Sequence, residues 1–125
     1  MNKCYIDYNI KNNDEIIKKK DIQAIYKKNK NIKFMDDDSL FNITLNNDKL
    51  ILEKETNDSQ IIFEFIENKK TQTKYYIKDL DFYIDTEIKT NLLEIDESNI
   101  MVEYELWLSN EYTGKFKYEI KIKEL

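Results

Sequence analysis

The sequence predicts an all-β fold, and the clearest indication is a hairpin pattern near its C-terminal end. Apolar side chains occupy every second position over residues 100–108 and again over residues 116–122, with mostly charged residues between them. Side chains on a strand point to opposite faces at each step. Each run therefore predicts a strand with one buried face and one solvated face.

Two further observations extend this prediction to the rest of the chain. Short alternating runs are separated by polar breaks about every 8–12 residues, which is typical of meanders, sandwiches and barrels. The breaks lie at residues 11–14, 28–31, 36–39, 46–48, 56–59, 68–70, 96–99 and 109–110. Only residues 14–26 fit a helical period, and adjacent isoleucines and three successive lysines interrupt that stripe. Because closure removes exposed edges, we predict a single antiparallel barrel of about eight to ten strands over residues 1–125.

The composition indicates which residues form the turns and where the ladders are irregular. The chain has one glycine and no proline, so Asn and Asp, which tolerate positive φ, are expected in the turns. The apolar parity switches near Leu92 and Leu93, which predicts a β-bulge there. A two-residue turn at 109–110 would oppose apolar to polar positions in the last hairpin. One extra residue at Thr113–Gly114 would shift the pairing by one position, so that apolar residues of the two strands oppose each other. We therefore predict a second bulge at that point.

Composition also indicates the class of protein and its location. A content of 41% hydrophobic and 36% charged residues is typical of one globular domain with a solvated exterior. Cys4 is the single cysteine, which favours a reducing compartment. Residues 1–7 have no apolar run of the length found in signal peptides, and no stretch approaches the roughly 20 apolar residues of a membrane span. We therefore expect a soluble, cytoplasmic protein that does not enter a membrane.

Five segments in the second part of the chain resemble a known family. Residues 39–45, 48–52, 61–64, 102–106 and 110–114 resemble the YwiB-like family of small bacterial domains of uncharacterised function. The resemblance covers residues 39–125, and more loosely 14–35, and it implies a lipocalin-type (calycin) β-barrel. It rests on strand order and hairpin pattern and includes no catalytic motif. The chain departs from the family at residues 76–80, where members usually carry a Tyr-x-Thr-Pro-Tyr-Gly-like segment, and at Ser109-Asn110, where Asn-Gly is typical.

The residue inventory argues against an enzyme. The chain has no histidine, which removes the usual general base near neutral pH, and no arginine, which removes bidentate phosphate clamps. Asp79, Asp81 and Asp85 could form a carboxylate pair, but their parity favours an exposed acidic face. The densest cluster of oxygen ligands, residues 36–38, lacks the ligand spacing of an EF-hand and is expected to be a solvated turn. We therefore predict no catalytic residues, no metal and no cofactor.

The predicted architecture favours binding of a small apolar ligand inside the barrel. A barrel of about eight strands is just wide enough to be filled by side chains or to hold one small ligand. Aromatic side chains would line such a site, and tyrosine hydroxyls could orient the ligand. The alternative is that the same rings simply fill the core. The candidate ligand-binding residues are Tyr26, Phe63, Phe65, Tyr75, Phe82, Tyr104, Phe116 and Tyr118.

Two alternative functions use the outside of the barrel. Trp107 lies on the polar parity, so it could mark a protein contact, or it could lie under the stems of Lys115 and Lys117. Residues 1–35 carry a net charge of +5 and the remainder −10, which suggests nucleic acid as another partner. The lysines concerned are Lys18, Lys19, Lys20, Lys27, Lys28, Lys30 and Lys33. Tyr26 and Phe34 share their parity with core residues, however, so we rank nucleic acid last.

Overall fold

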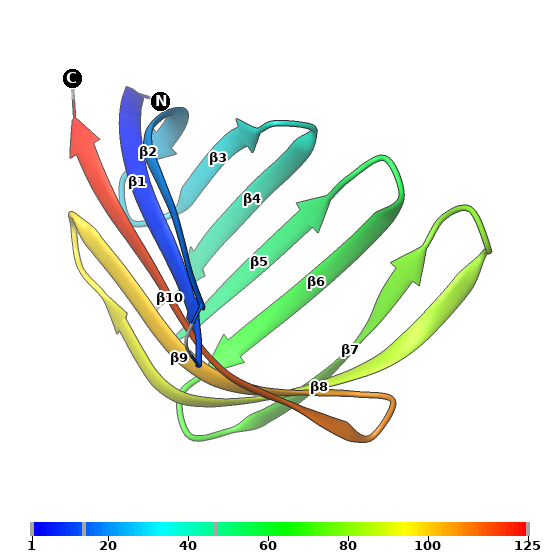
Figure 1. Ribbon diagram of the computed structural model, residues 1–125. Helices are drawn as coiled ribbons and strands as arrows, with labels where there is room; N and C mark the ends of the chain where they lie inside the picture. Colours follow the sequence, from blue (N-terminus) through cyan, green and yellow to red (C-terminus); the bar gives the residue numbers. More distant parts are fainter. Residues whose placement is uncertain (1, 14, 47, 125) are drawn as a thin grey trace.

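Ten β-strands form one closed barrel in the computed structural model, which describes residues 2–13, 15–46 and 48–124 (Figure 1). Asp14 and Asn47, which fall in two of the predicted breaks, lie outside the described residues. The strands are β1 (Asn2–Asn12), β2 (Glu15–Lys27), β3 (Asn31–Asp36), β4 (Ser39–Asn46), β5 (Lys49–Glu55), β6 (Ser59–Ile66), β7 (Lys70–Ile77), β8 (Phe82–Ile95), β9 (Asn99–Leu108) and β10 (Glu111–Glu124). No helix occurs within these residues, so the predicted all-β class is confirmed.

The barrel is an antiparallel meander that closes on itself. Each strand pairs with its neighbours in the sequence, and β1 closes the ring by pairing with both β2 and β10. In the closing ladder Ile6 opposes Ile122 and Tyr8 opposes Ile120. Residues far apart in the sequence therefore share one interior, and the predicted antiparallel barrel is confirmed.

Asn and Asp occupy most of the positions that need positive φ, as the composition predicts. Seven of the eight non-glycine residues with positive φ in the described part of the chain are Asn or Asp. They are Asn13, Asp21, Asn29, Asp37, Asn68, Asp81 and Asn110. The eighth is Ser109, which forms a two-residue turn with Asn110, and both residues have positive φ, as expected in a type I′ hairpin.

The predicted bulge at Gly114 is present. Leu108 opposes Glu111, but Leu106 opposes Gly114, so the register shifts by one residue after Tyr112. Tyr104 then opposes Phe116, which places apolar residues of β9 and β10 on the same face. Gly114 has φ of 145°, a conformation that side chains with a Cβ rarely adopt.

Two other bulges set which side chains face inward. The bulge predicted near Leu92 and Leu93 lies between Thr90 and Leu92. A further bulge, which the sequence analysis did not predict, lies in β2 opposite the Ile6–Tyr8 segment of β1. Asp21 takes φ of 56° there, and its backbone N–H donates to the Asp7 carboxylate at 2.9 Å. Past this bulge Lys19 opposes Tyr8, so its side chain faces the interior.

The prediction of Phe82 as an interior residue is wrong. Sequence alternation joined Leu80 and Phe82 to the following strand, but residues 78–81 form a turn between β7 and β8. Phe82 opposes Ile77 on the inward parity at the first position of β8. At this tip of the hairpin no further layer covers the ring, and Phe82 is 54% exposed.

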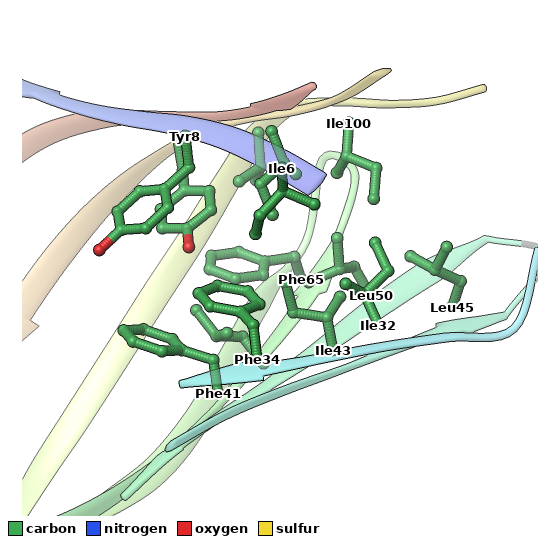
Figure 2. Packing of buried hydrophobic residues seen from close by; sticks show 14 of the residues in the cluster. Ile6, Tyr8, Ile32, Phe34, Phe41, Ile43, Leu45, Leu50, Phe65 and Ile100 are labelled. Atoms are coloured by element: carbon green, nitrogen blue, oxygen red, sulfur yellow. The ribbon is translucent and has the colours of Figure 1, made fainter. Parts of the chain in front are cut away.

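The core is one continuous apolar cluster inside the barrel. Aliphatic side chains, among them Ile6, Leu45 and Ile100, occupy one part, and Phe34, Phe41 and other rings occupy the rest (Figure 2). The buried polar residues among those described are Thr86 and Thr90. No charged residue is therefore buried in the part of the chain that the structure describes.

Candidate ligand site in the barrel interior

The barrel has one end at which inward-facing apolar side chains stay partly exposed. We call this end the mouth: it is formed by the turns after β1, β3, β5, β7 and β9. The turns after β5, β7 and β9 flare apart on the right of Figure 1. Inward-facing residues near the mouth, including Phe63, Tyr75, Ile84 and Phe116, are only half-buried. The interior is therefore closed at depth and accessible from this end.

Aromatic rings from three strands, β6, β9 and β10, meet on the mouth side of the core. The Tyr104 ring stacks on Phe116 at 5.4 Å and lies 4.9 Å from Phe65, measured between ring centroids. The Phe63 ring lies 5.8 Å from Phe65 and 6.1 Å from Tyr104, again between ring centroids. These rings touch one another, so they fill the depth of the barrel.

A second group of rings includes two buried tyrosines. Tyr8 stacks on Tyr118 with 5.8 Å between ring centroids and an angle of 3° between ring planes. Tyr8 also contacts Phe34 and Phe41, whose rings stack on each other at 4.7 Å. The Tyr8 hydroxyl points away from Leu45 and Ile100, on the side where Phe41 lies (Figure 2). This places the hydroxyl toward the mouth.

The polar group that holds Tyr8 is Asp36 at the end of β3. The Tyr8 hydroxyl donates a hydrogen bond to the Asp36 carboxylate. The Lys19 Nζ lies 3.9 Å from the same carboxylate and 3.7 Å from that of Asp37. Burial, followed by the hydrogen bond to Asp36, raises the pKa of Tyr8 well above its usual value. Tyr8 therefore remains a protonated donor at neutral pH.

Three buried polar atoms in this region have no hydrogen-bond partner among the described residues. They are Asn12 Oδ1, Thr90 Oγ1 and the Tyr118 hydroxyl. Asn12 opposes Phe116, which opposes Tyr104, which in turn opposes Thr90, so these four residues form one row across β1, β10, β9 and β8. Leaving a buried polar group unpaired costs about 1–3 kcal/mol, and native proteins usually supply a partner. Each of these three atoms can therefore accept a partner from outside the chain, either water or a ligand.

The hydroxyls of the buried tyrosines stay protonated. Burial raises the pKa of Tyr118 far above its usual value, and the nearby Tyr8, Tyr104 and Asp36 add to the shift. Burial alone raises the pKa of Tyr104. Both side chains can therefore donate a hydrogen bond to a neutral or anionic acceptor.

The structure brings five of the eight predicted ligand-binding residues into this region: Phe63, Phe65, Tyr104, Phe116 and Tyr118. Tyr75 is half-buried at the mouth, and its hydroxyl donates to Ser59 at 3.3 Å. Tyr26 is buried at the opposite end, where its hydroxyl donates to the Glu97 carbonyl at 3.2 Å. Phe82 lies outside the core, as described above.

Sequence reasoning missed three residues of the site: Tyr8, Asp36 and Lys54. Tyr8 shares the apolar parity of Cys4, Ile6 and Ile10, and this alternation could have identified it as an inward hydroxyl. Lys54 lies opposite Phe41 and Ile61, two buried residues, so it too is on the inward face. The pattern alone did not show that the strand reaches this far.

Trp107 is partly covered by neighbours other than those predicted. Lys70 Nζ lies 5.3 Å from the centre of the indole ring, and Tyr112 packs against it edge-on at 5.3 Å. Trp107 borders a polar hollow of about 320 Å³ on the outer face of β7, β8 and β9. A protein contact at Trp107 stays a prediction.

A larger hollow lies on the outer face of β1 to β4. Its volume is about 660 Å³, and Tyr5, Ile25, Met35 and Leu40 supply its apolar surface. Met35 is 62% exposed. A fluorescent apolar probe could bind here as well as in the interior, so any binding experiment needs a control at this surface.

The other chemical candidates remain at the surface. Asp79, Asp81 and Asp85 are exposed, and Asp81 accepts a hydrogen bond from the Tyr76 hydroxyl at 3.0 Å. The described residues contain no group of three side chains placed to hold a metal ion. Tyr26 and Phe34 are buried, so they form no stacking platform beside the lysines of β2 and β3. Within the same residues there is no helix long and apolar enough to cross a membrane.

The fold and site define the class: a closed, ten-stranded antiparallel barrel with an aromatic interior. The family model described as "Domain of unknown function (DUF1934)" matches residues 15–120, and the chain belongs to this family. The crystal structure of YwiB protein from Bacillus subtilis matches with a TM-score of 0.65 and 10% identity, covering 98% of this chain and 90% of that one. The resemblance to the YwiB-like family is thereby confirmed, and at this identity the match shows the fold alone. None of the curated proteins compared with the chain matches it.

Proposed function

We propose that this protein is a cytoplasmic, non-enzymatic binding protein that holds one small, mainly apolar ligand in the mouth side of its barrel. The observation that carries the proposal is the Tyr118 hydroxyl, which is buried among aromatic rings without a partner. A ligand with an apolar body and one polar group would pack against these rings and pair with that hydroxyl. In the neighbouring row, the Thr90 hydroxyl can donate or accept a hydrogen bond, and the Asn12 Oδ1 can accept one.

Access to this position is supported by the state of the side chains at the mouth. Phe63, Tyr75 and Phe116 face inward and remain partly exposed, so a ligand can reach them without unfolding of the barrel. The β6–β7 ladder supplies a second point of opening. Its regular pairing is limited to Ser59 with Ile77 and Gln60 with Tyr76. Further along, the Thr71 hydroxyl donates to the Glu64 carbonyl at 2.5 Å in place of a backbone donor.

The absence of histidine and arginine supports a binding role over catalysis. Asp36 is the one described carboxylate that affects the unpaired Tyr118 hydroxyl, and it already accepts a hydrogen bond from Tyr8 and pairs with Lys19. The protein therefore offers shape, apolar surface and hydrogen bonds.

The test is fluorescence titration with N-phenylnaphthylamine, an uncharged apolar fluorophore that carries one polar group. The wild-type protein should bind it saturably at one site. Tyr118→Phe removes only the hydroxyl that has no hydrogen-bond partner, and it should weaken binding about fivefold. Tyr26→Phe is the matched control, because its hydroxyl already has a partner at the opposite end, and it should leave the affinity unchanged.

The outer hollow requires its own control. Leu40→Gln alters that surface and should not affect the titration. Loss of binding in Leu40→Gln with full binding in Tyr118→Phe would place the probe outside the barrel and contradict the proposal. Absence of saturable binding would mean that water alone satisfies the orphan groups, and this too would overturn it.

A further inference from the structure

We propose that the ligand is an amphipathic carboxylate and that Lys54, at the mouth, binds its anionic group. This inference rests on the function proposed above, because it specifies the chemical class of the ligand for the same site. The observation behind it is an inward-facing cation beside apolar residues, with no acidic partner.

The register of β5 establishes where Lys54 points. Phe41 opposes Lys54 on one side, and Ile61 opposes it on the other. Opposed residues share a face of the sheet, and both neighbours are buried. Lys54 Nζ lies 5.4 Å from the centre of the Phe41 ring. The ammonium group is therefore held over an aromatic face that belongs to the interior.

The charge of Lys54 is not neutralised within the described part of the chain. Lys19, which also faces inward, lies within 4 Å of both Asp36 and Asp37. The acids next to Lys54 in sequence point to the outer face, where Glu55 pairs with Lys78 at 2.7 Å. None of the ion pairs of the described residues includes Lys54. An anion at this point would gain a partner that the protein does not supply.

The position of Lys54 relative to the unpaired Tyr118 hydroxyl indicates the shape of the ligand. The Phe41 ring beneath Lys54 contacts Tyr8, whose ring stacks on Tyr118. A continuous aromatic surface therefore connects the cation at the mouth with the unpaired hydroxyl inside. A carboxylate group on an apolar chain fits this arrangement, with the charge at the solvent side and the chain along the rings. Such a placement avoids the cost of burying the charge.

The experiment compares two competitors of equal chain length that differ in charge. Dodecanoate and dodecanol are each used, below the concentration at which they aggregate, to displace N-phenylnaphthylamine at neutral pH. Wild-type protein should bind dodecanoate about tenfold more tightly than dodecanol. Lys54→Met keeps an apolar stem and removes the charge, so it should abolish this preference while dodecanol binding stays within about twofold of wild type.

Lys33→Met is the matched control, since Lys33 is an exposed lysine of β3 on the outer face. This variant should keep the full preference for dodecanoate. Equal displacement by both competitors, or a preference that survives in Lys54→Met, would overturn the carboxylate inference and leave the binding function standing. Failure of both competitors to displace the bound probe would likewise overturn the carboxylate inference, whereas absence of saturable probe binding would count against the binding function itself.

Discussion

Tyr8 and Tyr118 stack with their rings 5.8 Å apart and almost parallel, yet only the Tyr8 hydroxyl has an acceptor. The two residues lie on the first and last strands, and closure of the barrel brings them together. Two tyrosines of similar burial thus differ in one respect: Tyr8 is satisfied by Asp36, and Tyr118 is available to a ligand.

This difference predicts opposite effects of removing the two hydroxyls in the absence of ligand. Tyr118→Phe should raise the free energy of unfolding by about 1 kcal/mol, because it eliminates an unpaired buried group. Tyr8→Phe should lower it by about 1–2 kcal/mol, because Asp36 loses its donor. Urea unfolding of both variants beside wild type measures the two values. A loss of stability in Tyr118→Phe would show that its hydroxyl has a partner after all.

Substitution of Gly114 should destabilise the barrel through the bulge of β10. Gly114→Ala introduces a Cβ at φ of 145°, and this atom would lie 3.3 Å from Asn12 Oδ1. We expect a loss of about 1–3 kcal/mol in urea unfolding. Thr113→Ala, at the exposed neighbouring position, should change stability by less than about 0.5 kcal/mol. Equal effects at the two positions would contradict the assignment of the strain to Gly114.

Stability should fall at alkaline pH because three tyrosines resist ionisation in the folded state. The pKa values of Tyr8, Tyr104 and Tyr118 are all raised by burial above the ordinary value of 10.0. Below about pH 10 these phenols are protonated in both states, so their contribution is fully present. As the pH rises further, the unfolded chain loses these protons while the folded chain keeps them, and the free energy of unfolding decreases.

Urea unfolding at about pH 8 and about pH 11 measures this decrease. Lysines also titrate in this range, so the control is Tyr118→Phe, which keeps every lysine and removes one shifted phenol. The alkaline loss should be smaller in this variant than in wild type. An identical loss would attribute the effect to the lysines and contradict the prediction.

Hydrogen exchange should identify the β6–β7 seam as the weakest part of the barrel wall. Regular pairing there covers only two residue pairs, whereas β5 and β6 pair over seven. Amides that face the seam should exchange at least about tenfold faster than those between β5 and β6. Thr71→Val, which removes the hydroxyl bonded to Glu64, should increase the difference. Uniform protection across both ladders would show that the seam is closed in solution.

Alternation and register counting predicted the antiparallel barrel and the bulge at Gly114, because these follow from local patterns. The same reasoning failed at Phe82, since inward parity does not show whether a strand tip extends beyond the core. The contact of Tyr8 with Tyr118, and the row from Asn12 to Thr90, depend on closure between distant strands. Lys54 was missed because a charged residue at a strand end gives no signal of which face it occupies until its partners are known.

The most direct test of the central claim is to observe where dodecanoate binds in solution. Intermolecular nuclear Overhauser effects between the alkyl chain and assigned side chains of the protein would measure this. The account predicts contacts with Phe41, Phe116 and Tyr118 in the interior, and none with Met35 or Leu40 on the outer face. Contacts confined to Met35 and Leu40, or no contacts at a saturating concentration, would contradict it.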